Sequence, residues 1–117
     1  MEIEFAKTVG AECKVREMMH NHGDDVNLFT DKTPYWEARD IMAEFMVYMH
    51  DGYIAKMRLE ALQIGKAPEK ENHISKEDFL SMEEEAFDRL FIKAADVFKN
   101  DGRTVFTKSE NGAKKKE

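Results

Sequence analysis

The chain of 117 residues contains little cysteine, proline or glycine, with one, two and six residues respectively. The single cysteine, Cys13, excludes a disulfide within the chain, and we expect a reducing compartment: the cytoplasm, or the host cytoplasm for a viral protein. No apolar run is long enough for a signal peptide or a transmembrane helix. The few glycines form no phosphate-binding loop, and the catalytic motifs GxSxG and HExxH are missing.

Apolar side chains and acid are what the chain does have. Apolar residues make up 42% of it, with eight Phe and eight Met, and a domain of this length buries roughly 65% of its unfolded surface. The net charge of −6 argues against direct binding of nucleic acid or of an anionic membrane, because both need lysine and arginine. We expect a single helical domain over residues 1–107, followed by a disordered basic tail over residues 108–117 (KSENGAKKKE).

Residues 34–64 predict a first long helix. Thr33 followed by Pro34 is typical of a helix start, with a capping hydroxyl and then proline at the first helical position. Apolar residues recur at helical spacing from there as far as Gly65. An unbroken helix has about 31 residues and a length of roughly 46 Å. Gly52 is its weak point, because glycine inside a helix costs about 1 kcal/mol relative to alanine, so two helices meeting there are the alternative.

Residues 75–102 predict a second long helix whose two ends are both marked. Ser75 can cap the free N–H groups of the first turn, and Asp78 completes a capping box. Asn100-Asp101-Gly102 is typical of a helix end. Between these ends an apolar face runs at helical spacing through Phe79, Met82, Ala86, Phe87, Leu90, Phe91, Ala94, Val97 and Phe98.

Two shorter segments complete the predicted fold. Residues 11–22 suit a short helix ending at Gly23, with Cys13 as a buried structural thiol. Residues 1–9 alternate apolar and polar side chains, which fits either an extended arm or a strand paired with residues 103–107. We therefore predict a mainly α fold: two long helices in an antiparallel hairpin, a shorter N-terminal helix packed across them, and the terminal β-pair as an optional addition.

Histidine gives only weak signals for metal chemistry. His20 and His22 are separated by one residue and so point to different faces of a helix, which does not favour zinc binding. His50 and His73 fall at predicted turns, where we expect solvated side chains.

The acidic residues do not form a catalytic pattern either. The run Glu83-Glu84-Glu85 lacks the Glu-x-x-His pattern of a di-metal helix site, and we expect a solvated face. Residues 99–110 depart from a calcium loop, because Lys99 and Arg103 replace two of its ligands. We predict no cofactor, no metal and no enzymatic activity.

The apolar face exceeds what one helical hairpin can cover, so either the short helix and the strands or a second subunit covers the rest of it. We expect the chain to bind itself, as a homo-oligomer, and a protein client, with no direct contact to nucleic acid or to a membrane. Large side chains on the predicted helices are the candidate protein-binding residues: Trp36, Phe45, Met49, Phe87 and Phe91.

The chain has a recognisable architecture, formed by the MEIEF opening, the two predicted long helices, the acidic DFLSMEEEAFDRLF segment and the terminal GAKKKE. In these features it resembles the small tail assembly chaperones of long-tailed bacteriophages. The resemblance implies a largely helical protein that self-associates and coats the tape measure protein before the tail tube polymerises around it. It carries over no functional residue.

The acidic residues support an alternative hypothesis from another class. The chain would then be an acidic phage inhibitor of a nucleic-acid-binding enzyme, an anti-restriction or anti-CRISPR protein that mimics DNA. Its carboxylates would stand in for phosphates at Glu77, Asp78, Glu83, Glu84, Glu85 and Asp88. Binding by such a mimic weakens steeply with ionic strength, whereas binding by aromatic side chains does not.

Overall fold

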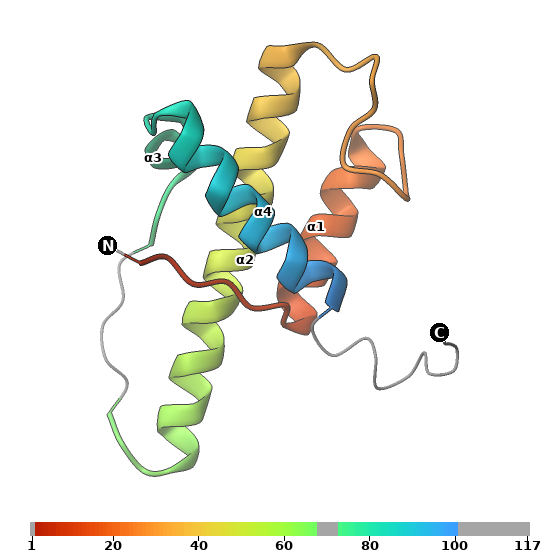
Figure 1. Cartoon of the computed structure of the whole chain (residues 1–117). Coiled ribbons are helices and arrows are strands. Elements are labelled where there is room, and N and C mark those ends of the chain that lie inside the picture. The colour runs from red at the N-terminus through yellow and green to blue at the C-terminus, as the bar shows by residue number, and fades with distance from the viewer. Residues whose placement is uncertain (1, 68–72, 101–117) are drawn as a thin grey trace, which may run out of the picture.

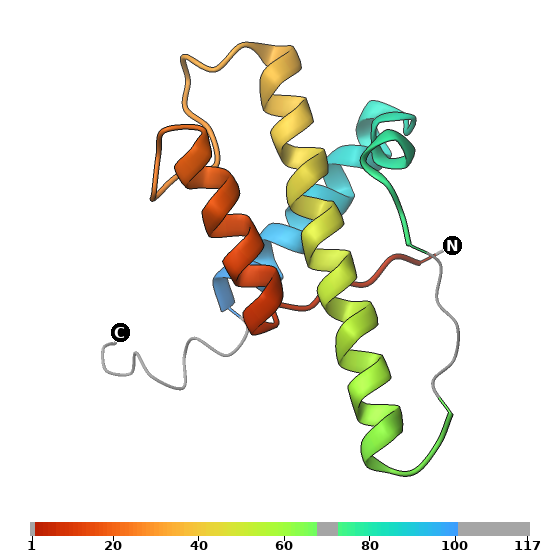
Figure 2. The ribbon, with the colours of Figure 1, turned by 180° about the vertical axis from the view of Figure 1, so that it is seen from behind.

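A computed structural model describes residues 2–67 and 73–100 of the chain (Figure 1). These residues form four helices: α1 (Val9–Asn21), α2 (Tyr35–Gln63), α3 (Lys76–Leu80) and α4 (Glu84–Asn100). Helix α2 is central, with α1 alongside it and α4 crossing its other side (Figures 1 and 2). The mainly α prediction is confirmed, and no strand occurs within the described ranges.

The N-terminal residues 2–8 form an extended segment that runs across α2 and ties three helices together (Figure 1). Lys93 of α4 donates a hydrogen bond from Nζ to the carbonyl oxygen of Ile3, at 2.9 Å. Lys7 donates from Nζ to the carbonyl oxygen of Phe98, at 2.8 Å. The extended-arm alternative therefore holds for these residues, whereas the predicted partner strand over residues 103–107 lies outside the described residues.

His50 is buried against this segment, which corrects the prediction of a solvated turn residue. It lies within α2 with 6% of its surface exposed, stacked against the ring of Tyr53. Its Nδ1 lies 2.8 Å from the carbonyl oxygen of Glu4, and because a carbonyl only accepts, Nδ1 carries the proton. His73 does lie at the surface, where it pairs with Asp51 at 2.8 Å.

Gly52 does not break α2, which continues through it for 29 residues, or about 43 Å. The N-terminal segment explains why glycine stands here. A Cβ at this position would lie 2.5 Å from the carbonyl oxygen of Ala6 and 2.9 Å from Cβ of Ala11. The Ala6 N–H donates to the carbonyl oxygen of Met49 at 3.0 Å. Glycine thus allows the backbone of the segment to lie directly on the helix.

The predicted helix over residues 75–102 is two helices, with a break at residues 81–83. Its start is as predicted, since Ser75 and Asp78 form a reciprocal capping box. The break has a local cause: the Ser81 hydroxyl donates to the carbonyl oxygen of Glu77 at 2.8 Å, and the Met82 N–H turns back to Phe79. Phe79 is fully buried at this turn, and only the 17 residues of α4 continue as a long helix.

Two smaller predictions are also corrected. Cys13 is exposed, because α1 buries Ala11 and Val15, and Cys13 lies about 200° around the helix from each of them. Helix α2 begins at Tyr35 with Pro34 in the N-cap position. Thr33 therefore does not cap the helix, and its hydroxyl instead accepts from the Thr30 N–H at 3.1 Å.

We predict that Gly52→Ala lowers the free energy of unfolding by about 1–3 kcal/mol, because the added methyl group collides with the backbone of Ala6. Gly10→Ala is the matched control, since a Cβ there meets only Thr8 Oγ1 at 4.0 Å, and we expect a gain of about 0.5 kcal/mol. Urea unfolding followed by circular dichroism measures both. Equal stability of the two variants would contradict the close packing at Gly52.

Candidate protein-binding surfaces

The first candidate surface is a pocket at the start of α2, where this helix meets α3 and the beginning of α4. It has a volume of about 350 Å³ and is called the aromatic pocket below. Its lining residues are Tyr35, Trp36, Arg39, Leu80, Met82, Glu84 and Phe87. Trp36 is 72% exposed and Tyr35 66% exposed, while Phe87 is buried. The pocket therefore presents accessible aromatic rings beside an apolar residue of the core.

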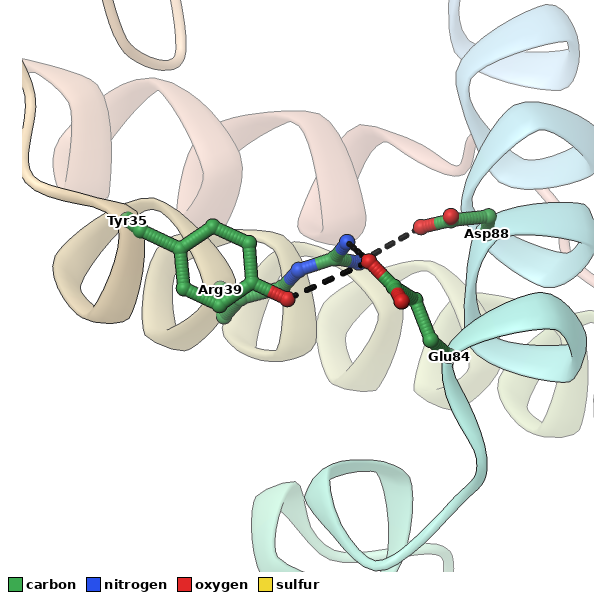
Figure 3. Close-up of polar contacts among 4 residues, drawn as sticks. All are labelled: Tyr35, Arg39, Glu84 and Asp88. Carbon is green, nitrogen blue, oxygen red and sulfur yellow. Dashed lines mark hydrogen bonds and ion pairs between the residues drawn. The ribbon is translucent and has the colours of Figure 1, made fainter.

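Arg39 fixes one wall of the aromatic pocket by joining α2 to α4 (Figure 3). Its Nη1 donates to Asp88 Oδ1 at 2.5 Å, and its Nη2 donates to Glu84 Oε2 at 2.9 Å. The Tyr35 hydroxyl donates to the same Glu84 oxygen at 3.3 Å. The guanidinium carbon also lies 5.0 Å from the centre of the Tyr35 ring and 5.1 Å from that of Phe87, so cation–π contacts add to the ion pairs.

The hydrogen bond to Asp88 is the largest cause that raises the pKa of Arg39 above its ordinary value, so the guanidinium is charged at every physiological pH. Glu84 and Asp88 were expected on a solvated face, and their side chains are indeed 67% and 45% exposed. Sequence reasoning missed that both carboxylates bind an arginine of another helix. Only the tertiary arrangement brings Arg39 to them.

The second candidate surface is the C-terminal part of α2, residues 53–64, called the α2 arm below. Every buried residue of α2 lies between Ile41 and Gly52. Beyond Gly52 the helix projects past the other helices, as both views show (Figures 1 and 2). The arm nevertheless carries four exposed large apolar side chains, at Met57, Leu59, Leu62 and Ile64.

The apolar side chains of the α2 arm form two rows. Ala55, Leu59 and Leu62 follow one another at the i, i+4, i+7 spacing of a single helix face. Met57 and Ile64 belong to a second row on another side of the helix, and Arg58 lies between the two rows. A helix that is apolar on more than one side is normally covered by other parts of a protein. Within the described residues nothing buries this one.

The candidate binding residues from the sequence are placed very differently from one another. Trp36 is exposed in the aromatic pocket. Phe45, Met49 and Phe87 are buried in the core, and Phe91 is half-buried against it. The Phe45 ring lies 5.7 Å from the Phe91 ring, centre to centre. In this fold, therefore, Trp36 is the member of the set that is available to a partner.

Residues 2–67 and 73–100 contain neither a cluster of metal-binding side chains nor a helix that could span a membrane. No three side chains of His, Cys, Asp or Glu gather there as a metal site would require, and His20 pairs instead with Asp25 at 2.8 Å. None of the four helices combines the length and the apolar character needed to cross a bilayer.

Comparison of the chain with models of protein families, with curated proteins and with solved structures finds no significant match.

We predict that Arg39→Ala lowers the free energy of unfolding by about 1–2 kcal/mol, between the values typical of exposed and of buried ion pairs. The side chain of Arg39 is 19% exposed, and its loss leaves the two carboxylates without their shared partner. Arg39→Lys is the control, and we expect about half the loss because an ammonium cannot serve both carboxylates in the same planar geometry. Urea unfolding measures both variants. An unchanged stability of Arg39→Ala would mean that this contact does not hold α4 on α2.

Proposed function

We propose that the chain is a protein-binding assembly protein that self-associates and shields apolar helical segments of a client, in the manner of a phage tail assembly chaperone. The client would be a long helical protein such as a tape measure protein, met in the cytoplasm or host cytoplasm. The exposed Cys13 thiol fits a reducing compartment of this kind. The observation that carries the proposal is the α2 arm, a projecting helix with four exposed large apolar side chains.

The magnitude of the apolar contribution indicates that both surfaces take part. Fully burying a leucine, isoleucine or methionine contributes about 1.5–3 kcal/mol, and these side chains are already about half covered, so each has about 1 kcal/mol left to gain. The four side chains of the α2 arm then contribute about 4 kcal/mol, which only reaches the lower end of the cost of association. The aromatic pocket, with the exposed rings of Trp36 and Tyr35, supplies the further contacts that binding needs.

The alternative, an acidic inhibitor that mimics DNA, has fewer free carboxylates than the sequence indicates. Glu84 and Asp88 bind Arg39, and the Asp78 carboxylate accepts the Ser75 N–H in the capping box at 3.0 Å. Three of the six carboxylates assigned to phosphate mimicry are thus already engaged. The apolar surfaces therefore support protein binding better than the acidic residues support mimicry.

The test is a titration with a synthetic amphipathic helical peptide that has leucine on one face and uncharged polar residues on the other. We expect binding, measured by the anisotropy of a dye on the peptide, and a blue shift of the emission of Trp36, the single tryptophan of the chain. Affinity should be unchanged between 0.1 and 1 M salt, where the screening length falls from about 10 to about 3 Å.

The control peptide replaces leucine by glutamine, and we expect it not to bind. Absence of binding by the leucine peptide would contradict the proposal. Binding of a lysine-rich peptide in its place, lost at 1 M salt, would favour the acidic inhibitor instead.

A further inference from the structure

We infer that the α2 arm of one copy docks in the aromatic pocket of a second copy, so that chains join head to tail. The inference deepens the proposed function, on which it rests for self-association, by naming the two surfaces that join and the occupant of each. Both surfaces are exposed and apolar, one as a projecting helix and the other as a concave pocket.

The charges of the two surfaces are opposite. Residues 53–64, the α2 arm, carry Lys56 and Arg58 against Glu60, a net charge of +1. The segments that form the pocket and its surroundings, residues 35–40 and 76–89, carry eight acidic and three basic residues, a net charge of −5. Two arms or two pockets brought together would repel, whereas an arm and a pocket attract. Charge therefore favours pairing of unlike surfaces over a symmetric pairing of like ones.

The α2 arm and the pocket each place charged side chains of opposite sign beside apolar ones. The row of Ala55, Leu59 and Leu62 has Arg58 on one edge and Lys56 on the other, at 100° of rotation per residue. The pocket has an apolar floor at Phe87, and its rim includes the carboxylate of Glu84. Glu83 and Glu85, both exposed, flank Glu84 in the chain. An apolar row between two cations thus meets an apolar hollow beside several carboxylates.

An α2 arm that occupies the aromatic pocket must come from another copy. Trp36 and Leu59 lie 23 residues apart on one continuous helix, which is about 35 Å at 1.5 Å per residue. The α2 arm therefore cannot fold back into the aromatic pocket of its own chain. Each junction leaves one free arm and one free pocket, so copies add in sequence until a ring closes or a filament forms.

The test uses two variants of the full 117-residue chain. The arm variant is Leu59→Glu with Leu62→Glu, and the pocket variant is Trp36→Glu with Leu80→Glu. All four side chains are exposed, so we expect both variants to fold. The control variant is Val9→Glu with Val26→Glu, which places the same charges at exposed valines that belong to neither surface.

Light scattering reports the mass of each sample. We expect the unmodified chain and the control variant to form species that grow with concentration, and each surface variant alone to stay at the 13.6 kDa of one chain. The equimolar mixture of the two surface variants should give a species of two chains that grows no further, because it contains one intact arm and one intact pocket.

Other outcomes overturn the inference. If the pocket variant dimerises alone, the arms pair with each other; if the arm variant does, the pockets pair. A mixture that remains monomeric also overturns it. If the unmodified chain is itself a monomer but still binds the leucine peptide, the head-to-tail contact is wrong while client binding stands. Absence of peptide binding to the dilute, monomeric chain, together with head-to-tail growth at higher concentration, would leave the contact intact and reject client shielding.

A charge exchange provides a second, independent measurement. Lys56→Glu with Arg58→Glu should weaken association with the unmodified pocket at least tenfold. Glu83→Lys with Glu85→Lys should have a similar effect from the other side. A chain that carries all four changes can pair only a reversed arm with a reversed pocket, so its association should recover, and failure of this rescue would contradict the pairing of these charges.

Discussion

The backbone of Ala6 passes so close to Gly52 that no side chain fits between them, and the positions of the other helices follow from this contact. Helix α1 begins directly after the crossing and so lies against the middle of α2. Lys93 and Lys7 then connect the same segment to α4. Because these bonds go to backbone groups, they fix the course of the chain and not merely a side-chain conformation.

The core formed around this crossing explains why most of the large side chains are not available for binding. Phe45 of α2 lies within 6 Å of the rings of both Phe91 and Phe98, and Phe79 closes the turn between α3 and α4. A chain of this size has a high ratio of surface to volume and needs most of its aromatic residues to cover the interior. Six of the ten exposed large apolar residues in the described part of the chain lie at the two ends of α2: Tyr35, Trp36, Met57, Leu59, Leu62 and Ile64. The side chains at these two ends are exposed because α2 extends beyond the helices that pack on its middle, and not because the local sequence is polar.

The sequence predicts this fold well where a signal is local. The capping box of Ser75 and Asp78 and the helical spacing through α2 identify helices that the structure contains. The break at Ser81 is not predictable in the same way, because the apolar spacing continues through it. The burial of His50 depends on a segment more than 40 residues away. Of the candidate surfaces, Trp36 could be identified as an exposed anchor, but the α2 arm could not, because periodicity shows which residues are apolar and not which of them lack a neighbour.

The bonds of the N-terminal segment also set an order of events during synthesis. Lys7 and Ile3 bond to residues about 90 positions later in the chain, so their partners are synthesised long after them. Until then the N-terminal segment can bond to α2, through Ala6 to Met49 and through Glu4 to His50, but not to α4. Such long-range closure is slow compared with helix formation. The α2 arm is complete well before this closure, so the growing chain carries this exposed apolar helix before the contacts to α4 close the core.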